Sequence, residues 1–195
     1  IDRSNLEAMN MIGMYHSLKG NIDSSDYYFR QAYNSHENVK SRTIYDAIAL
    51  SNLGYNLIKK GKYDEAIPYF RAGFTYLLDR NNYKPVSEAT IGLAQCYLEK
   101  GDMKRAKQLI DSSLIYIDKS ANHNLYRSLY PLMCEYYVKT GNKALAYAYL
   151  DSAIAFNERY LNKYNSTYIL RAEQELFEAE ANAKNEELRY QNEIY

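Results

Sequence analysis

The sequence predicts an all-α protein, a right-handed superhelical solenoid of about four helix pairs followed by a long C-terminal helix. A short break centred on glycine recurs at Gly20, Gly61, Gly101 and Gly141, so that successive glycines are 41, 40 and 40 residues apart. A constant period of roughly 20 to 50 residues is typical of arrays in which helical hairpins stack. With three prolines and eight glycines in 195 residues, the chain also lacks the frequent turns of an all-β fold.

The residues that follow each glycine match as well. The side chain is small five residues later, large and apolar nine residues later, and small again twelve residues later. Helices that meet at small residues approach closely, while large side chains fill the space between the pairs. A glycine with positive φ ends the first helix and turns the chain into the second. The matching positions are Ser25, Ala66, Ala106 and Ala146; Phe29, Phe70, Ile110 and Leu150; and Ala32, Gly73, Ser113 and Ala153.

The four units predict helix pairs near residues 5–19 and 24–36, 41–60 and 63–80, 85–100 and 103–119, and 123–140 and 143–163. Each hairpin has an apolar face that it cannot bury alone, so the pairs stack and form a concave and a convex side. We assign residues 1–165 to the solenoid, with units near 5–36, 41–80, 85–119 and 123–163. Residues 166–195 are assigned to a capping or connecting helix.

The last segment has no glycine break, and its apolar residues recur every three, four or seven positions between charged ones. This spacing predicts a narrow heptad-like stripe on one long helix. Two interpretations remain open. The helix either caps the open end of the solenoid, or it connects to a coiled coil or a membrane span and forms a homodimer. The stripe consists of Ile169, Ala172, Leu176, Ala179, Ala183 and Tyr190.

Composition and charge exclude several classes of partner. The 24 basic and 24 acidic side chains balance, so no overall field attracts nucleic acid or an anionic membrane. No apolar run reaches 18 residues, so membrane attachment would need a segment outside this chain, which we expect to be part of a longer protein. The 23 tyrosines suit either packing in a thin scaffold or aromatic anchoring of a ligand.

The sequence predicts neither an enzyme nor a cofactor or metal site. His16, His36 and His123 fall in different units without metal-binding spacing. Cys96 and Cys134 lie in apolar helical stretches, which favours free thiols, although their redox state stays open. No nucleophile motif or phosphate-binding glycine loop is present.

The segment "NLGYNLIKKGKYDEAIPYFRAGF", residues 52–74, resembles the tetratricopeptide repeat (TPR). The period near 40, compared with 34 in the standard repeat, implies longer helices, and the expected tryptophan is absent. The residues that match the TPR pattern are Leu53, Gly54, Gly61, Tyr63, Ala66 and Phe70.

The TPR resemblance implies that the first helix of each pair lines a concave groove that binds a protein or peptide. TPR cochaperones that hold a C-terminal carboxylate place Lys, Asn and Arg at these positions. Here only Asn10 and Asn52 fit and the basic residues are missing, which favours an extended peptide or another neutral polymer. It is equally open that these side chains are ordinary solvated ones. Alignment on the glycines gives Asn10, Met14, Ser17, Ile48, Ser51, Asn52, Tyr55, Glu88, Ile91, Gln95, Ser128 and Glu135, together with Glu7, Ile58 and Pro131.

The whole layout also resembles the extracytoplasmic part of bacterial membrane-anchored TPR regulators. In these, the last helix runs into a membrane span, a coiled coil and a cytoplasmic helix-turn-helix domain. This resemblance implies a periplasmic sensor domain of a transcriptional regulator, which takes part in signal transduction and does not itself bind nucleic acid. The alternative is a free-standing, soluble adaptor in the cytoplasm that brings two proteins together.

Overall fold

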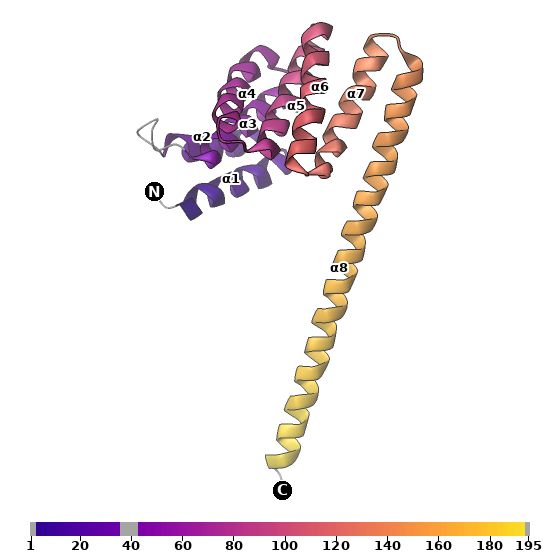
Figure 1. Cartoon of the computed structure of the whole chain (residues 1–195). Helices are drawn as coiled ribbons and strands as arrows, with labels where there is room; N and C mark the ends of the chain where they lie inside the picture. The colour runs from indigo at the N-terminus through magenta and orange to yellow at the C-terminus, as the bar shows by residue number, and fades with distance from the viewer. Residues whose placement is uncertain (1–2, 36–42, 194–195) are drawn as a thin grey trace. The chain divides into compact units, whose positions relative to one another are not determined.

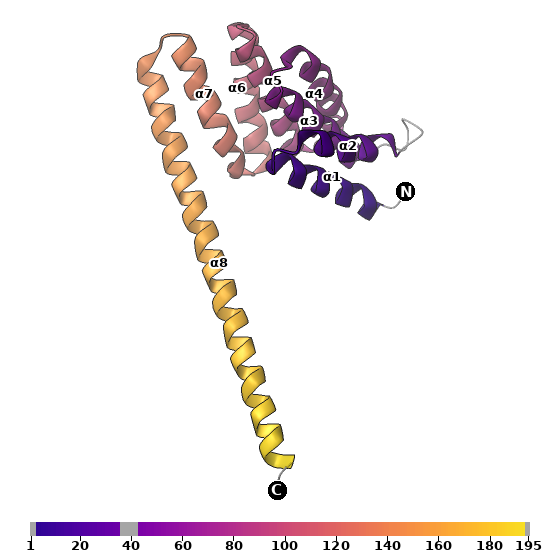
Figure 2. The ribbon, with the colours of Figure 1, turned by 180° about the vertical axis from the view of Figure 1, so that it is seen from behind.

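The computed structural model describes residues 3–35 and 43–193, and every regular element within them is helical (Figure 1). Seen from the front and from behind, α1 to α7 lie beside one another as a row of hairpins (Figure 2). The elements are α1 (Arg3–Leu18), α2 (Ile22–Asn34), α3 (Ile44–Lys59), α4 (Tyr63–Leu78), α5 (Tyr83–Glu99), α6 (Met103–Ser120), the 3-10 turn η2 (His123–Leu125), α7 (Tyr126–Lys139) and α8 (Lys143–Glu193).

The four glycine turns are built alike, as the period predicts. Gly20, Gly61, Gly101 and Gly141 have φ of 80°, 70°, 77° and 79°, a left-handed conformation that a Cβ disfavours. In each turn the residue after the glycine donates its backbone N–H to a carbonyl five residues earlier, which satisfies the end of the first helix. These bonds are Asn21 to His16, Lys62 to Leu57, Asp102 to Tyr97 and Asn142 to Tyr137, all 2.9 Å long.

The core lies between successive hairpins, where large and small residues alternate as predicted. The ring of Phe70 in α4 is fully buried between Gly54 of α3 and Gly92 of α5. A Cβ added to Gly54 would lie 2.8 Å from the ring, and one added to Gly92 would lie 2.4 Å from it. Ala66, Ala106 and Ile110 are also buried. Phe70 thus fills a space that exists only because both neighbours lack a side chain.

A buried polar network joins the first two hairpins. The amide nitrogen of Asn56 in α3 donates to the Ser25 hydroxyl at 2.8 Å and to the Asp26 carboxylate at 2.7 Å. The Asn56 carbonyl oxygen accepts from the Ser17 hydroxyl at 2.9 Å. Asn56 and Ser25 are almost completely buried, so water cannot easily replace the hydrogen bond between them.

Replacing Asn56 with leucine is therefore expected to lower the free energy of unfolding by about 1–3 kcal/mol, because buried Ser25 loses its partner. Urea denaturation followed by circular dichroism measures this loss. Asn34→Leu is the matched control, since Asn34 is exposed on α2. Equal denaturation midpoints for Asn56→Leu and the native protein would contradict the assigned role.

The structure has one continuous helix, α8, where the sequence analysis expected separate helices at 143–163 and 166–195. The physical reason is that no glycine or proline occurs after Gly141, so nothing interrupts the hydrogen-bond ladder. The chain divides into two compact units, Ile1–Asp151 and Ser152–Tyr195. The predicted division at residue 165 stays a prediction.

Two further expectations concern residues that the structure leaves undescribed. The side chains of the predicted stripe from Ile169 to Tyr190 are outside the described ones, and so are His36 and the predicted helix limits at 36 and 41.

Helix α3 begins at Ile44 because Thr43 caps it. The Thr43 hydroxyl accepts from the backbone N–H of Tyr45 at 3.2 Å, and Asp46 completes the capping box.

Candidate functional site: a groove along the first helices of the hairpins

The first helices of the second, third and fourth hairpins line a hollow of about 250 Å³, here called the central hollow. Six of its seven lining residues are groove positions predicted from the glycine alignment. The seventh, Leu132, adds to an apolar floor that also includes Ile91. The lining residues are Tyr55, Ile91, Gln95, Ser128, Pro131, Leu132 and Glu135.

A second hollow of about 230 Å³, here called the N-terminal hollow, involves α1, α2 and α3. Four of its residues were predicted, and Tyr55 lines this hollow as well as the central one. The two hollows therefore adjoin at Tyr55 and together form one groove. The N-terminal hollow is lined by Met14, Ser17, Leu18, Phe29, Asn52, Tyr55 and Lys59.

Tyr55 is held firmly between the two hollows. Its hydroxyl donates to the backbone carbonyl of Glu88 in α5 at 2.6 Å, and its ring packs edge-on against Phe70 with centroids 5.0 Å apart. Burial, with a contribution from the Glu88 charge, raises the pKa of Tyr55, so the phenol stays protonated and keeps donating. Tyr55 thus fixes the spacing of α3 and α5 beneath the groove.

Asn52 presents an unused hydrogen-bond donor in the N-terminal hollow. Its side-chain amide nitrogen is buried and finds no hydrogen-bond partner among the described residues. A buried donor without an acceptor costs about 1–3 kcal/mol. If the Asn52 side chain turned this buried nitrogen toward the hollow, a ligand carbonyl would recover that free energy, which favours a ligand with backbone-like acceptors.

Lysines contribute more to the groove than the sequence analysis foresaw. Lys59 lines the N-terminal hollow and donates to the Ser17 hydroxyl at 2.7 Å. Lys139 pairs with Glu135 of the central hollow at 2.8 Å and with Glu99 at 3.0 Å. Both lysines stand two residues before a turn glycine, and this shared position in the sequence could have identified them as groove residues. The Glu135 carboxylate is thus paired with a lysine, whereas the Lys59 ammonium is hydrogen-bonded to uncharged groups of Ser17 and keeps its positive charge.

Two predicted groove residues are packing residues instead. Asn10 is only 4% exposed, and its amide nitrogen donates to the carbonyls of Leu6 and Tyr45, both at 3.1 Å. Ser51 is 5% exposed and donates to the Ala47 carbonyl at 3.1 Å. Both face neighbouring helices because successive residues rotate by about 100° around a helix.

The remaining predicted positions lie outside the lining of both hollows. Glu7 accepts a hydrogen bond from the Tyr45 hydroxyl at 3.0 Å, and Ile58 packs against the main core. Ile48 and Glu88 are half-buried. The structure therefore brings together eight of the twelve principal groove residues: Met14, Ser17, Asn52, Tyr55, Ile91, Gln95, Ser128 and Glu135.

Burial raises the pKa of the Glu88 carboxyl, with Lys84 opposing the shift. A carboxyl whose pKa is higher in the folded than in the unfolded protein binds more protons when folded, so its charge lowers stability above the folded pKa. Glu88→Gln is expected to raise the denaturation midpoint at neutral pH and to have no effect well below pH 4.5. Thermal denaturation across this range measures the difference, and Glu175→Gln on exposed α8 is the control. A gain independent of pH would contradict the assignment.

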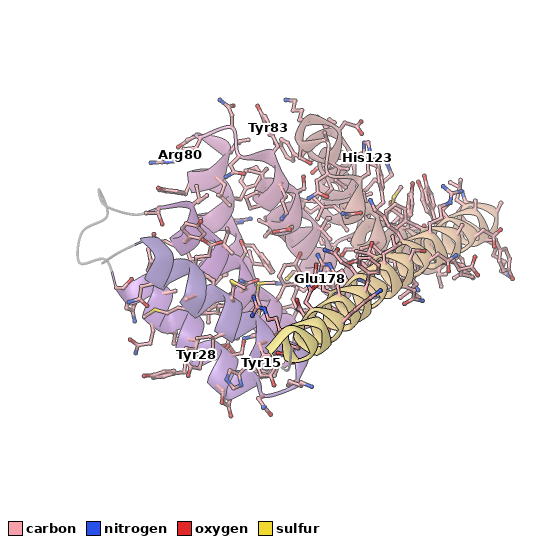
Figure 3. All side chains as sticks on the ribbon, turned by 90° about the horizontal axis from the view of Figure 1, so that it is seen from below. Tyr15, Tyr28, Arg80, Tyr83, His123 and Glu178 are labelled. Atoms are coloured by element: carbon pink, nitrogen blue, oxygen red, sulfur yellow. The ribbon has the colours of Figure 1, made fainter. Side chains whose placement is uncertain are left out.

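Many tyrosines are used in packing within and between hairpins. Tyr137 and Tyr149 stack with ring planes 5° apart, and Tyr83 stacks on Tyr116 at a centroid distance of 6.2 Å. Figure 3 shows Tyr15 and Tyr28 at the edge of the solenoid opposite Tyr83 and His123. The packing interpretation therefore accounts for the two stacked pairs, Tyr137 with Tyr149 and Tyr83 with Tyr116, while Tyr55 also borders the groove.

Cys96 and Cys134 are free thiols, and burial raises the pKa of Cys96 to about 12. Across residues 3–35 and 43–193, no three His, Cys, Asp or Glu side chains cluster as metal ligands would. No helix within these ranges has an apolar stretch long enough to span a membrane.

Comparison with known proteins supports the repeat assignment. A family model described as a tetratricopeptide repeat matches residues 57–129. A search of curated proteins finds no match. Among solved structures, aspartyl phosphate phosphatase F from Bacillus subtilis is 16% identical with a TM-score of 0.68, covering 82% of this chain and 42% of that protein. The apo form of RapI is 17% identical with a TM-score of 0.68, covering 85% and 61%.

A third similar structure is the TPR2AB domain of yeast Sti1 in complex with pHSP90, which is 16% identical with a TM-score of 0.50, covering 83% and 78%. The present chain spans less than two thirds of the first two proteins, and at these identities the likeness concerns the fold. The family model identifies tetratricopeptide repeats within residues 57–129, and the glycine-centred hairpins and these neighbours show that the chain has the predicted all-α, right-handed, TPR-like solenoid fold.

Proposed function

We propose that this chain is a non-catalytic binding module that holds an extended protein segment or peptide in the groove formed by the two hollows. TPR domains are protein-interaction modules, and this one offers side-chain amides above an apolar floor. The observation that carries the proposal is the convergence of eight predicted residues from four hairpins on the adjoining hollows.

The groove chemistry favours a neutral, extended ligand. Gln95 and Ser128 supply donors and acceptors beside Ile91 and Leu132, while Asn52 supplies a donor without a protein partner. An extended peptide exposes its backbone carbonyls and N–H groups at regular intervals, and such groups pair well with fixed amide side chains. Binding of this kind needs neither a metal nor a cofactor.

The groove proposal is tested by selecting binders from a randomised peptide library and measuring their affinity by fluorescence polarisation. Asn52→Ala and Gln95→Ala are each expected to weaken binding about tenfold, which corresponds to about 1.4 kcal/mol for one lost hydrogen bond. Gln108→Ala is the matched control, because Gln108 lines a different hollow, beside Arg71 and Arg105. Equal affinities for all four proteins would place the binding surface elsewhere.

For the whole protein, we propose a periplasmic sensor domain of a membrane-anchored transcriptional regulator. The specific support is α8, which is at once the second helix of the fourth hairpin and the continuous C-terminal helix that ends at Glu193. A ligand that binds two arrangements of this helix with different affinity would shift their populations. The alternative, a soluble adaptor, would use the same groove without such coupling.

The gene sequence beyond Tyr195 separates the two roles. A regulator requires an apolar span of about 20 residues there, followed by an output domain. A stop codon at that place would remove the regulator and leave the adaptor. The peptide-binding experiment is independent of this outcome.

A further inference from the structure

The fourth hairpin ends in an apolar surface that the earlier hairpins bury. Three residues before the turn glycine, Leu98 of the third unit is 1% exposed and Val138 of the fourth is 62% exposed. Nine residues after the glycine, Ile110 is 1% exposed and Leu150 is 43% exposed. In the third unit these residues belong to a core cluster that includes Leu129, Leu132 and Met133 of α7, the first helix of the next hairpin. The fourth unit keeps the same apolar chemistry without a cover.

This surface, here called the C-terminal end face, is hollowed. A cavity of about 280 Å³ lies on it, and its lining is almost entirely apolar. All of its residues belong to the compact unit Ile1–Asp151. They are Cys134, Val138, Gly141, Lys143, Ala146, Tyr147 and Leu150.

The first hairpin shows the complementary situation. Two positions of a first helix contact the preceding hairpin. Gly92 of α5, nine residues before its turn glycine, closely approaches Phe70. Asn56 of α3, five residues before its own turn glycine, donates to Ser25. These positions of a first helix therefore face the hairpin before it. In α1 they are Met11 and Tyr15, which are 64% and 57% exposed.

Together with Leu18, which is 83% exposed, Met11 and Tyr15 form an apolar strip on α1, here called the N-terminal end face. Figure 3 shows Tyr15 at this edge of the solenoid. The two end faces are thus the two halves of the contact that each hairpin makes with the next, and in this chain neither half is covered among the described residues.

We propose that two copies of this chain associate head to tail, with the N-terminal end face of one copy packed on the C-terminal end face of the other. The inter-hairpin contacts within the chain supply the pattern. Within one chain α5 packs beside the second hairpin, and between copies α1 of one copy would pack in the same way beside the fourth hairpin of the other. Such an interface is heterologous, so it joins different surfaces and leaves one of each kind free. The inference rests on the repeat packing, and of the end-face residues only Leu18 also lines the groove.

The register also predicts how the interface differs from the internal ones. Within the chain, Lys60 pairs with Asp23 and Lys100 pairs with Asp64. In both pairs the lysine is the residue before a turn glycine, and the aspartate comes three residues after the turn glycine of the preceding hairpin. Between copies the lysine would be Lys19, and the acceptor position is Ala144. The association therefore depends on apolar contact and is expected to be insensitive to salt.

Sedimentation velocity at increasing protein concentration tests the proposal. The native chain is expected to form complexes that grow with concentration at both low and high salt. Val138→Glu and Met11→Glu should each weaken association at least about tenfold, that is by about 1.4 kcal/mol or more. Ile115→Glu is the control, because Ile115 is a similarly exposed apolar residue on α6.

Mixing the two variants distinguishes this arrangement from others. Val138→Glu keeps an intact N-terminal end face and Met11→Glu keeps an intact C-terminal one, so the mixture should form a two-chain complex that neither variant forms alone. A native chain that stays monomeric up to about 1 mM would overturn the proposal. A Kd of 1 mM corresponds to a binding free energy of only about 4.1 kcal/mol, which is too weak for the proposed interface. A dimer that persists in both variants would also overturn it, because it would form through other residues such as the C-terminal helix.

Discussion

Phe70→Ala is expected to lower the free energy of unfolding by about 3–5 kcal/mol, the loss typical of truncating a fully buried phenylalanine. Phe70 makes the contact between the second and third hairpins, with its ring against Gly54, Gly92 and Tyr55. Two of these neighbours are glycines in helices, so no side chain can rotate into the space that the ring leaves. Collapse of the cavity would require movement of the backbone of α3 or α5.

Urea denaturation measures the loss, and Phe177→Ala is the matched control because Phe177 is 71% exposed on α8. In a repeat protein each hairpin is stabilised by its neighbours, so a weakened second contact also destabilises the array on both sides. The urea unfolding transition of Phe70→Ala should therefore begin at a lower urea concentration and be broader, because the hairpins unfold less cooperatively. Equal midpoints for the two alanine variants would show that the ring contributes little to the inter-hairpin contact.

The repeated turn was predictable because its physical requirement is local. A left-handed residue that ends a helix is best supplied by glycine, and the glycines at a constant period show it directly. The continuous helix α8 was missed for a related reason. The repeat period suggested a helix of ordinary length in the fourth unit, while the absence of glycine and proline after residue 141 indicated that nothing would end it.

The groove was predictable only in part, because a side chain's partners come from other hairpins. Of the positions aligned on the glycines, Gln95, Ser128 and Glu135 line the central hollow, and Gln95 and Glu135 occupy the same position in successive units. Asn10, aligned in the same way, is buried, and its amide nitrogen donates to the carbonyl of Tyr45, 35 residues away and on another helix. Whether a polar residue bonds to the protein or is left for a ligand depends on such contacts, which the repeat period does not specify.

Gly92→Ala is expected to destabilise the protein by about 1–3 kcal/mol through overpacking, although alanine is the better helix former by about 1 kcal/mol. The added Cβ would lie 2.4 Å from two carbon atoms of the Phe70 ring, closer than non-bonded atoms approach. The ring is fully buried and has little room to retreat. Steric conflict therefore outweighs helix propensity, and the net effect is a loss.

A double-mutant cycle separates these two contributions. In a Phe70→Leu background the aromatic ring is absent, so the conflict is relieved and Gly92→Ala should become neutral or stabilising. The change of sign, measured by urea denaturation of the native protein, both single variants and the double variant, would assign the cost to the contact with Phe70. An equal loss of stability in both backgrounds would instead mean that a side chain at residue 92 is destabilising for a reason other than contact with the Phe70 ring. The close approach of the hairpins at Phe70 would then not explain why residue 92 is glycine.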